Sequence, residues 1–251
     1  MSPQTAPTTD GNAPETVTRL DDDAAQTVPE RRPWRDYPLS CWYVIPITKR
    51  LAALLAPTWV RPAHITGLGL LLGLSAVVLL IVAPAAGLGA AALVLGAWFM
   101  DRTDGLLARR QGTATPLGAW LDANVDELHD VAWHAAGAYA AARVTLSPWP
   151  WYLLAGFLGG KYLFINSVHE ERVVSGANEA APASPCAEPS GHRWLRTLYH
   201  LPGNADIRLH LLVTALATGW MTIELALIAL YYNLRWIIRF AIVPQRLGGR
   251  S

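Results

Sequence analysis

Cysteine and charged residues are both scarce in this chain of 251 residues. Only two residues are cysteine, and charged residues make up 16% of the sequence against 52% hydrophobic ones. Two cysteines exclude a disulfide-rich scaffold, and neither Cys41 nor Cys186 has the spacing of a metal-binding motif. The net charge of +1 gives no indication of nucleic acid as a partner, and none is expected. So little charge is unusual for a soluble globular domain and favours a membrane protein.

Long apolar runs divide the chain into six candidate membrane spans. No charged residue occurs from Ile65 to Met100, and Pro84 and Gly87 break that run, so a hairpin of two spans is expected there. Four further spans are predicted at Pro116–Ala142, Trp149–Val168, Ile207–Met221 and Ile223–Ile242. The predicted fold is therefore an all-α, integral membrane bundle of about six transmembrane helices, with five spans as the alternative.

The segments outside these spans have a different composition. Residues 1–30 are rich in Thr, Pro, Asp and Ala without an apolar run, which predicts a disordered cytoplasmic tail and no signal peptide. Leu39–Leu55 mixes Trp, Tyr, Ile and Leu with Lys49 and Arg50, which is typical of an interfacial helix on the inner leaflet; an ordinary loop is the alternative. A flexible loop is expected at Ser175–Gly191. The predicted boundaries are a tail at 1–30, an interfacial segment at 31–61, a transmembrane domain at 62–243 and a cytoplasmic tail at 244–251.

Lys and Arg gather in the loops on one side of the predicted bundle. They precede the first span, lie between the second and third and between the fourth and fifth, and follow the sixth, whereas the opposite loops carry only Arg143. The positive-inside rule places both termini and the Arg102–Thr115 loop in the cytoplasm. The expected location is a multi-pass protein of the cell membrane.

Four aspartates lie in or near the Arg102–Thr115 loop. Asp101 and Asp104 are i,i+3 neighbours on a helix, so both carboxylates lie on one helical face. The same holds for Asp122 and Asp126, which are i,i+4 neighbours. Carboxylates crowded into one volume repel each other unless cations lie between them, and Mg²⁺ or Mn²⁺ suits such hard oxygen ligands. Two such ions about 3.5–4 Å apart form a phosphoryl-transfer site. Solvated acids at two helix ends are the alternative.

The aspartates belong to a longer pattern, D-x2-D-G-x2-A-R-x8-G-x3-D-x3-D. It is matched at Asp101, Asp104, Gly105, Ala108, Arg109, Gly118, Asp122 and Asp126. The pattern resembles the motif of the CDP-alcohol phosphotransferase (CDP-alcohol phosphatidyltransferase) family. The resemblance implies transfer of a substituted phosphoryl group from a CDP-activated donor to an alcohol, with release of CMP and two metal ions in the site. It implies that Asp101, Asp104 and Asp122 bind metal, and that Asp126 is both a metal ligand and the general base.

Donor contacts are also implied by the resemblance. Arg61–Thr66 is similar to the P-N-x-x-T entry to the first span of many family members: Pro62 and Thr66 match, and Ala63 stands in place of the usual Asn. The Leu39–Thr66 lead-in is similar to that of family members that handle inositol phosphates. The expected donor-binding residues are Thr66, Gly105, Ala108, Arg109 and Gly118.

Charged residues in the later spans suggest an acceptor site. Lys161 lies within an apolar span and Arg208 at the start of another, so the two are candidates for an anion site; snorkelling to an interface is the alternative. Asp130 lies one turn beyond Asp126 and either lines the acceptor pocket or bonds a neighbouring helix. His134, a further turn on, is interpreted as a buried polar group.

Three functions fit these observations. The first is a membrane phosphotransferase with CDP-diacylglycerol as donor and a small, anionic alcohol as acceptor. The second uses a soluble CDP-alcohol donor and a lipid or polyol-phosphate acceptor. The third is a small cation transporter, in which acids would be expected near the membrane midplane rather than at one face. The number of subunits is left open, with a homodimer as one option.

Overall fold

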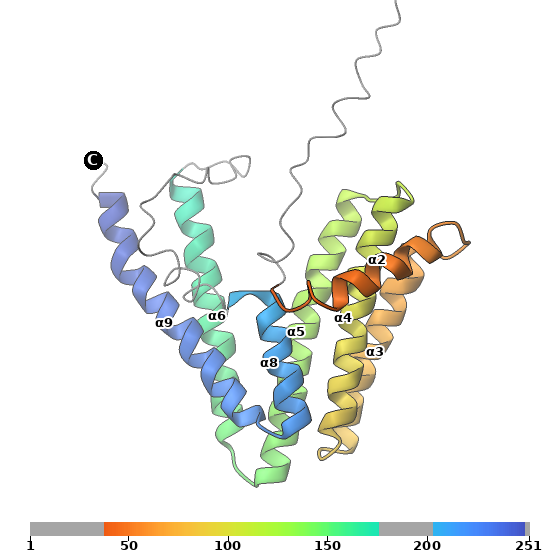
Figure 1. Ribbon diagram of the computed structural model, residues 1–251. Helices are drawn as coiled ribbons and strands as arrows, with labels where there is room; N and C mark the ends of the chain where they lie inside the picture. The colour runs from red at the N-terminus through yellow and green to blue at the C-terminus, as the bar shows by residue number, and fades with distance from the viewer. Residues whose placement is uncertain (1–37, 176–202, 249–251) are drawn as a thin grey trace, which may run out of the picture. The chain divides into compact units, whose positions relative to one another are not determined.

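The computed structural model describes residues 38–175 and 203–248, which all belong to one compact unit, Pro33–Ser251. The predicted tail at 1–30 and nearly all of the predicted Ser175–Gly191 loop lie outside the described residues. Within the described residues every regular element is a helix, so the all-α prediction is confirmed. The helices are α2 (Val44–Leu55), α3 (Pro62–Val82), α4 (Gly87–Arg110), α5 (Pro116–Thr145), α6 (Trp149–Val174), α8 (Ala205–Thr218) and α9 (Met221–Gly248) (Figure 1).

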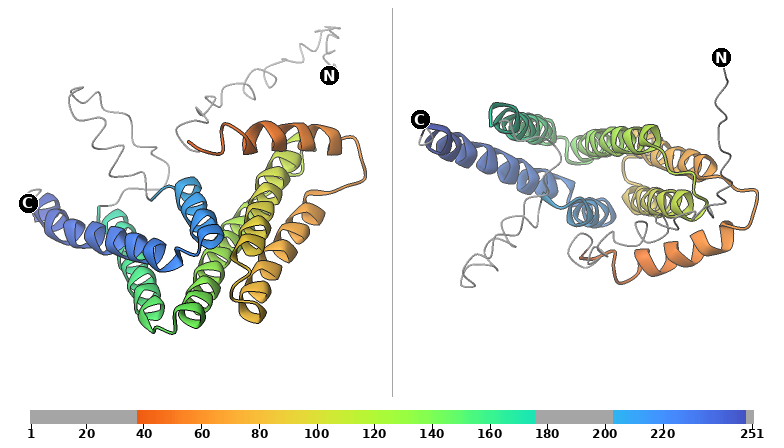
Figure 2. Two further views of the ribbon diagram at one scale, coloured as in Figure 1. Left: turned by 60° about the horizontal axis from the view of Figure 1, so that its bottom comes forward. Right: turned by 90° about the horizontal axis from the view of Figure 1, so that it is seen from above.

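Two closely packed helix pairs are joined by α5 and α8. One pair is α3 with α4, and the other is α6 with α9. Helix α5 contacts α3, α6 and α9, and α8 contacts α4 and α9, so these two helices lie between the pairs (Figures 1 and 2). Apolar side chains from these helices form one continuous core, in which the largest fully buried members are Phe157, Leu80, Leu212, Leu225 and Ile228.

The helix boundaries follow local chain chemistry. The Thr115 hydroxyl caps α5 by accepting from the Gly118 amide at 3.1 Å, and Pro116 occupies the first helical turn. Helix α4 continues beyond the predicted span end at Met100 as far as Arg110. The predicted span Ile207–Met221 is too long, because Gly219 adopts a left-handed conformation (φ 77°) that ends α8 at Thr218.

Two of the helices are long and apolar enough to cross a membrane, judged by length and composition: Pro62–Val82 and Met221–Gly248. Helix α8, with 14 residues, is about 21 Å long, which is less than the roughly 30 Å of a bilayer core. Helices α4, α5 and α6 have the length but carry charged residues. The six-span arrangement therefore stays a prediction.

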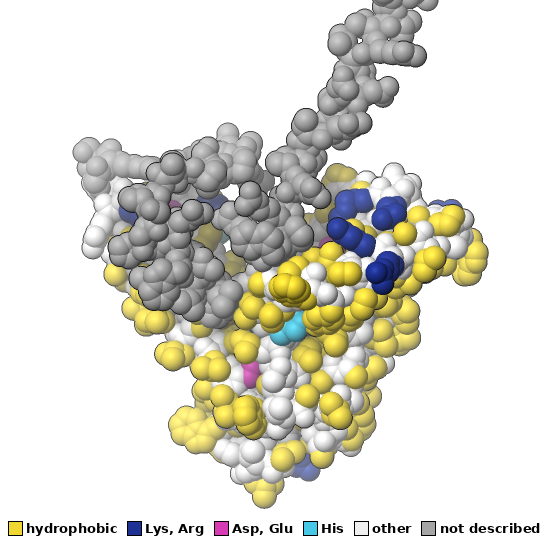
Figure 3. Space-filling view, viewed as in Figure 1, with side chains coloured by type: hydrophobic (Ala, Val, Ile, Leu, Met, Phe, Trp, Pro, Cys, Tyr) yellow, Lys and Arg dark blue, Asp and Glu magenta, His cyan; other side chains and the backbone are white. Residues whose placement is uncertain are grey.

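Helix α2 crosses the end of α4 and is shorter than predicted. Residues Leu39–Tyr43 form a turn, and the helix begins at Val44. Its Lys49 and Arg50 are exposed, and Lys and Arg side chains gather over this helix while the face below is largely hydrophobic (Figure 3). This is the distribution that an interfacial helix requires.

Candidate active site

Three of the four motif aspartates meet where α4 leaves the helix bundle and α5 enters it. One carboxylate oxygen from each of Asp101, Asp104 and Asp122 lies within 4.8 Å of the other two. Oxygens bound to one Mg²⁺ at about 2.1 Å are at most about 4.2 Å apart, so this group needs little adjustment to hold an ion. The turn at Gly112, whose φ is 65°, reverses the chain between the two helices.

Asp104 is the most enclosed of the three ligand candidates. Its carboxylate is buried and accepts a hydrogen bond of 2.6 Å from the hydroxyl of Thr66 on α3. Burial raises the pKa of Asp104 to about 6, against the lowering effect of the Thr66 hydrogen bond, and the charges of Asp101 and Asp122 add to the rise. A cation at the centre of the group would favour the ionised form. Thr66 therefore contacts a candidate metal ligand directly.

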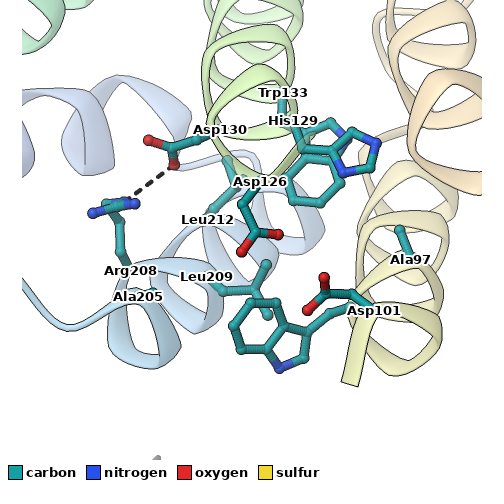
Figure 4. A pocket seen from close by; sticks show the side chains of 11 residues that line it. Ala97, Asp101, Asp126, His129, Asp130, Trp133, Ala205, Arg208, Leu209 and Leu212 are labelled. Atoms are coloured by element: carbon teal, nitrogen blue, oxygen red, sulfur yellow. Dashed lines mark hydrogen bonds and ion pairs between the residues drawn. The ribbon is translucent and has the colours of Figure 1, made fainter. Parts of the chain in front are cut away.

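Asp126 is not one of these three ligands, but its side chain interacts directly with that of Asp101, and it lines the cleft. Its carboxylate points toward that of Asp101 across the space between α5 and α4 (Figure 4). The Arg102 guanidinium joins the two, since it bonds Asp101 at 2.6 Å and lies 3.8 Å from Asp126. The Asp126 side chain is 43% exposed, so a hydroxyl from a bound molecule could reach it.

An open cleft, whose volume of about 490 Å³ includes space continuous with solvent, lies beside these carboxylates. Its lining combines charged and apolar side chains from α4, α5 and α8, among them Asp101, Asp126, His129, Asp130, Trp98 and Arg208.

The predicted acceptor residues form an ion-pair network next to the cleft. Asp130 accepts from the Lys161 ammonium at 2.5 Å and from the Arg208 guanidinium at 3.1 Å. Lys161 also bonds Glu127 at 2.6 Å, and Arg208 donates to the Tyr232 hydroxyl at 2.7 Å. The two cations are thus matched by two carboxylates. Asp130 and Arg208 line the cleft, whereas Lys161 reaches it only through Asp130.

The motif glycines have no neighbouring backbone against them among the described residues. A Cβ added at Gly105 would meet only the Arg109 side chain, at 3.6 Å, and one at Gly118 only the Thr115 hydroxyl, at 3.2 Å. Close helix packing therefore does not account for either glycine. Ala108 lies one turn beyond Asp104 on α4, on the same helix as Arg109.

Comparison with known proteins places this sequence in a family. The sequence model of the CDP-alcohol phosphatidyltransferase family matches residues 59–188, about half of the chain. The chain belongs to this family. The matched residues include Thr66, the four aspartates and Lys161, whereas Arg208 lies beyond them.

A curated relative belongs to the same family. The chain is 27% identical over 188 residues to a protein of Aquifex aeolicus named "Bifunctional IPC transferase and DIPP synthase". The match covers 74% of this chain and 40% of that protein, so the chain spans less than half the length of its relative. Membership of the family supports a CDP-alcohol phosphotransferase enzyme.

Several residues in and beside the candidate site were not recognised from the sequence. Arg102 pairs with both Asp101 and Asp126, and Glu127 is the second partner of Lys161. His129 lines the cleft and stacks on Trp133 with ring centroids 4.6 Å apart. Each sits within four residues of a motif aspartate, which is the signal that could have found them.

His134 is buried between helices. Its ring nitrogens contact the Asp130 backbone carbonyl at 2.5 Å and the Glu224 carboxylate at 3.2 Å. Glu224, in the first turn of α9, is itself buried. These contacts fit the interpretation of His134 as a satisfied buried polar group.

Proposed function

We propose that this protein transfers a substituted phosphoryl group, a phosphatidyl group in the first instance, from a CDP-activated donor to an alcohol, releasing CMP. The acceptor oxygen forms a bond to the donor phosphorus, the bond from that phosphorus to CMP breaks, and the hydroxyl proton moves to Asp126. The observation that carries the proposal is the meeting of Asp101, Asp104 and Asp122 beside a cleft that Asp126 also lines.

The aspartate carboxylates are suitable ligands for two divalent cations, Mg²⁺ or Mn²⁺. Asp101, Asp104 and Asp122 would hold one ion, and a second would need Asp126 to draw toward the group, away from Arg102. When bound, the ions neutralise the donor diphosphate and stabilise the departing CMP. Thr66 holds the Asp104 carboxylate in place through its hydrogen bond, so we assign it to ligand positioning as well as to the donor site.

Asp126 has the position that a general base requires. It lines the cleft and its side chain is 43% exposed, so a hydroxyl can reach its carboxylate, which also interacts with Asp101 and Arg102. The CDP-activated donor would lie against four further motif residues: Gly105, Ala108, Arg109 and Gly118. Among the described residues no backbone packs against the two glycines, so a donor diphosphate would have room to approach them.

The acceptor would lie on the Asp130 and Arg208 side of the cleft. An anionic acceptor needs an available cation, and Arg208 can supply one if its pairing with Asp130 is shared with the acceptor. Lys161→Ala and Arg208→Ala are then expected to raise the acceptor KM much more than the donor KM. Unchanged acceptor kinetics in both variants would point to a neutral alcohol.

A second candidate keeps the chemistry and changes the donor. A soluble CDP-alcohol donor with a lipid or polyol-phosphate acceptor would use the same aspartates and the same cleft. In both cases the enzyme would be an integral membrane protein with its site at the cytoplasmic face, since Lys and Arg gather over α2 beside a hydrophobic exterior.

The test is CMP release by the purified protein. CDP-diacylglycerol and soluble CDP-alcohols would be combined with free polyols, polyol phosphates and amino alcohols, with Mg²⁺ or Mn²⁺. Asp101→Asn is the inactive control, and Glu170→Gln, an exposed carboxylate outside the cleft lining, is the matched active control. The proposal would be contradicted if none of the donors yielded CMP, or if Asp101→Asn released CMP as fast as the wild type. Ion uptake by vesicles that contain the protein, without CMP release, would favour a transporter.

A further inference from the structure

A buried polar connection links the chain before α2 to the start of α8. The turn Pro38–Tyr43, here called the Ser40 turn, meets the first turn of α8 (Figure 1). Asp206 of α8 accepts from the Leu39 amide at 2.7 Å and from the Ser40 amide at 3.0 Å. Its other oxygen accepts from the Ser40 hydroxyl, and both side chains are fully buried. A carboxylate is thus held with three donors from one turn.

A second contact strengthens this junction. The Tyr43 hydroxyl bonds the Nε2 atom of His210 at 2.5 Å, and the Nδ1 atom of His210 contacts the Asp206 backbone carbonyl at 2.6 Å. The Tyr43 ring also packs edge-on against Phe99 of α4. The Ser40 turn is therefore fixed to both α8 and α4.

The same serine contacts the wall of the cleft. Its hydroxyl oxygen accepts a hydrogen bond of 3.1 Å from the indole nitrogen of Trp98, a cleft-lining residue. The Arg102 guanidinium lies 4.3 Å from the centre of the Trp98 ring, in a cation–π contact. Arg102 in turn bonds Asp101 and lies near Asp126. A continuous set of contacts therefore runs from Asp206 to the two carboxylates.

We propose that Ser40 and Asp206 are positioning residues that set the orientation of Arg102 against Asp101 and Asp126 through Trp98. Removing the serine hydroxyl takes away the acceptor of the Trp98 indole, and the Trp98 ring is the surface against which the Arg102 guanidinium lies. Ser40 and Asp206 both lie outside residues 59–188, the part matched by the family. The flanks of the family region would thus tune its central site. This inference rests on the proposed function for its kinetic readout only.

The chain offers a matched control for Ser40. Thr48 of α2 is equally buried, and its hydroxyl bonds only a carbonyl of its own helix, that of Ile45 at 3.2 Å, among the contacts described. Ser40→Ala and Thr48→Val each delete one buried hydroxyl from the same part of the chain. Ser40→Ala also removes a donor to the buried Asp206 carboxylate, so its structural cost can exceed that of Thr48→Val, but only Ser40→Ala should disturb Trp98.

The kinetic test is a double-mutant cycle with Arg102→Gln, measured as kcat/KM for CMP release. Ser40→Ala is expected to lower kcat/KM by about tenfold in the wild-type background and by less than about twofold in the Arg102→Gln background. Thr48→Val should have the same effect in both backgrounds. Equal factors for Ser40→Ala in both backgrounds, or an effect no larger than that of Thr48→Val, would overturn the proposal.

A second measurement needs no donor. Fluorine NMR of the 5-fluorotryptophan-labelled protein identifies the Trp98 signal as the one lost in Trp98→Phe. That signal should shift in Ser40→Ala and in Arg102→Gln and stay in place in Thr48→Val. A stationary signal in Ser40→Ala refutes the connection whatever the activity. A shifted signal in a protein that releases no CMP would support the connection and count against the proposed function alone.

Discussion

Asp130 and Glu127 bind the same lysine but differ in how exposed they are to solvent. Mutating each in turn therefore compares a buried ion pair with an exposed one. Both accept from the Lys161 ammonium, at 2.5 Å and 2.6 Å. The Asp130 side chain is 12% exposed and that of Glu127 56% exposed. Asp130 also holds Arg208, whose other contact here is the neutral Tyr232 hydroxyl.

Asp130→Asn should therefore be far more costly than Glu127→Gln. The asparagine leaves two enclosed cations with one exposed carboxylate between them, and breaking a buried ion pair on one side costs about 3–5 kcal/mol. Glu127→Gln removes a solvent-screened partner, for which at most about 1 kcal/mol is expected. The difference corresponds to a factor of about 30 or more in the unfolding equilibrium constant at 25 °C.

The measurement is the free energy of unfolding by denaturant titration in mixed detergent micelles, for both variants and the wild type. Adding Lys161→Met to Asp130→Asn should recover part of the loss, because it removes one of the unpaired cations. Equal destabilisation by Asp130→Asn and Glu127→Gln would refute the assignment of the network's stability to the buried carboxylate.

Three further outcomes follow from the aspartates and the predicted topology. Excess chelator should abolish CMP release and Mg²⁺ or Mn²⁺ restore it, with Asp101→Asn and Asp122→Asn severely impaired; full activity in chelator would remove the metal hypothesis. Raising Mg²⁺ should partly rescue Asp101→Asn but not Asp126→Asn, whose kcat should fall by about 10²–10⁴-fold with donor binding retained; equal rescue would show that Asp126 is not the base. In a cysteine-free background, an impermeant reagent added to intact cells should label Ser147→Cys and not Gly112→Cys, and the reverse pattern would invert the topology.

The sequence predicted best those arrangements that depend on residues close together in the chain. Asp101 and Asp104 share one face of α4 because i,i+3 spacing on a helix guarantees it. A short turn then suffices to bring Asp122 beside them. Which members of the group Asp126 contacts depends on how α5 tilts against α4, and residue spacing does not contain that tilt.

Contacts between distant segments were the hardest to predict. Lys161 and Arg208 are conspicuous in apolar surroundings, but their common partner Asp130 lies 31 and 78 positions away, so only helix packing reveals the pairing. The Ser40 and Asp206 contact joins residues 166 positions apart. Neither Ser40 nor Asp206 belongs to a sequence pattern that would predict a contact, so the sequence alone did not indicate this one.

The uninterrupted course of α4 limits how this chain can change in length. One helix carries the apolar residues that pack into the core, such as Val94 and Ala97, and two of the candidate ligands, Asp101 and Asp104. One residue inserted between Ala97 and Asp101 would keep the helix and its hydropathy but rotate both carboxylates by about 100° relative to the packed face. The loop after Arg110 can absorb an insertion, whereas within α4 even a neutral alanine would turn the ligands away from Asp122.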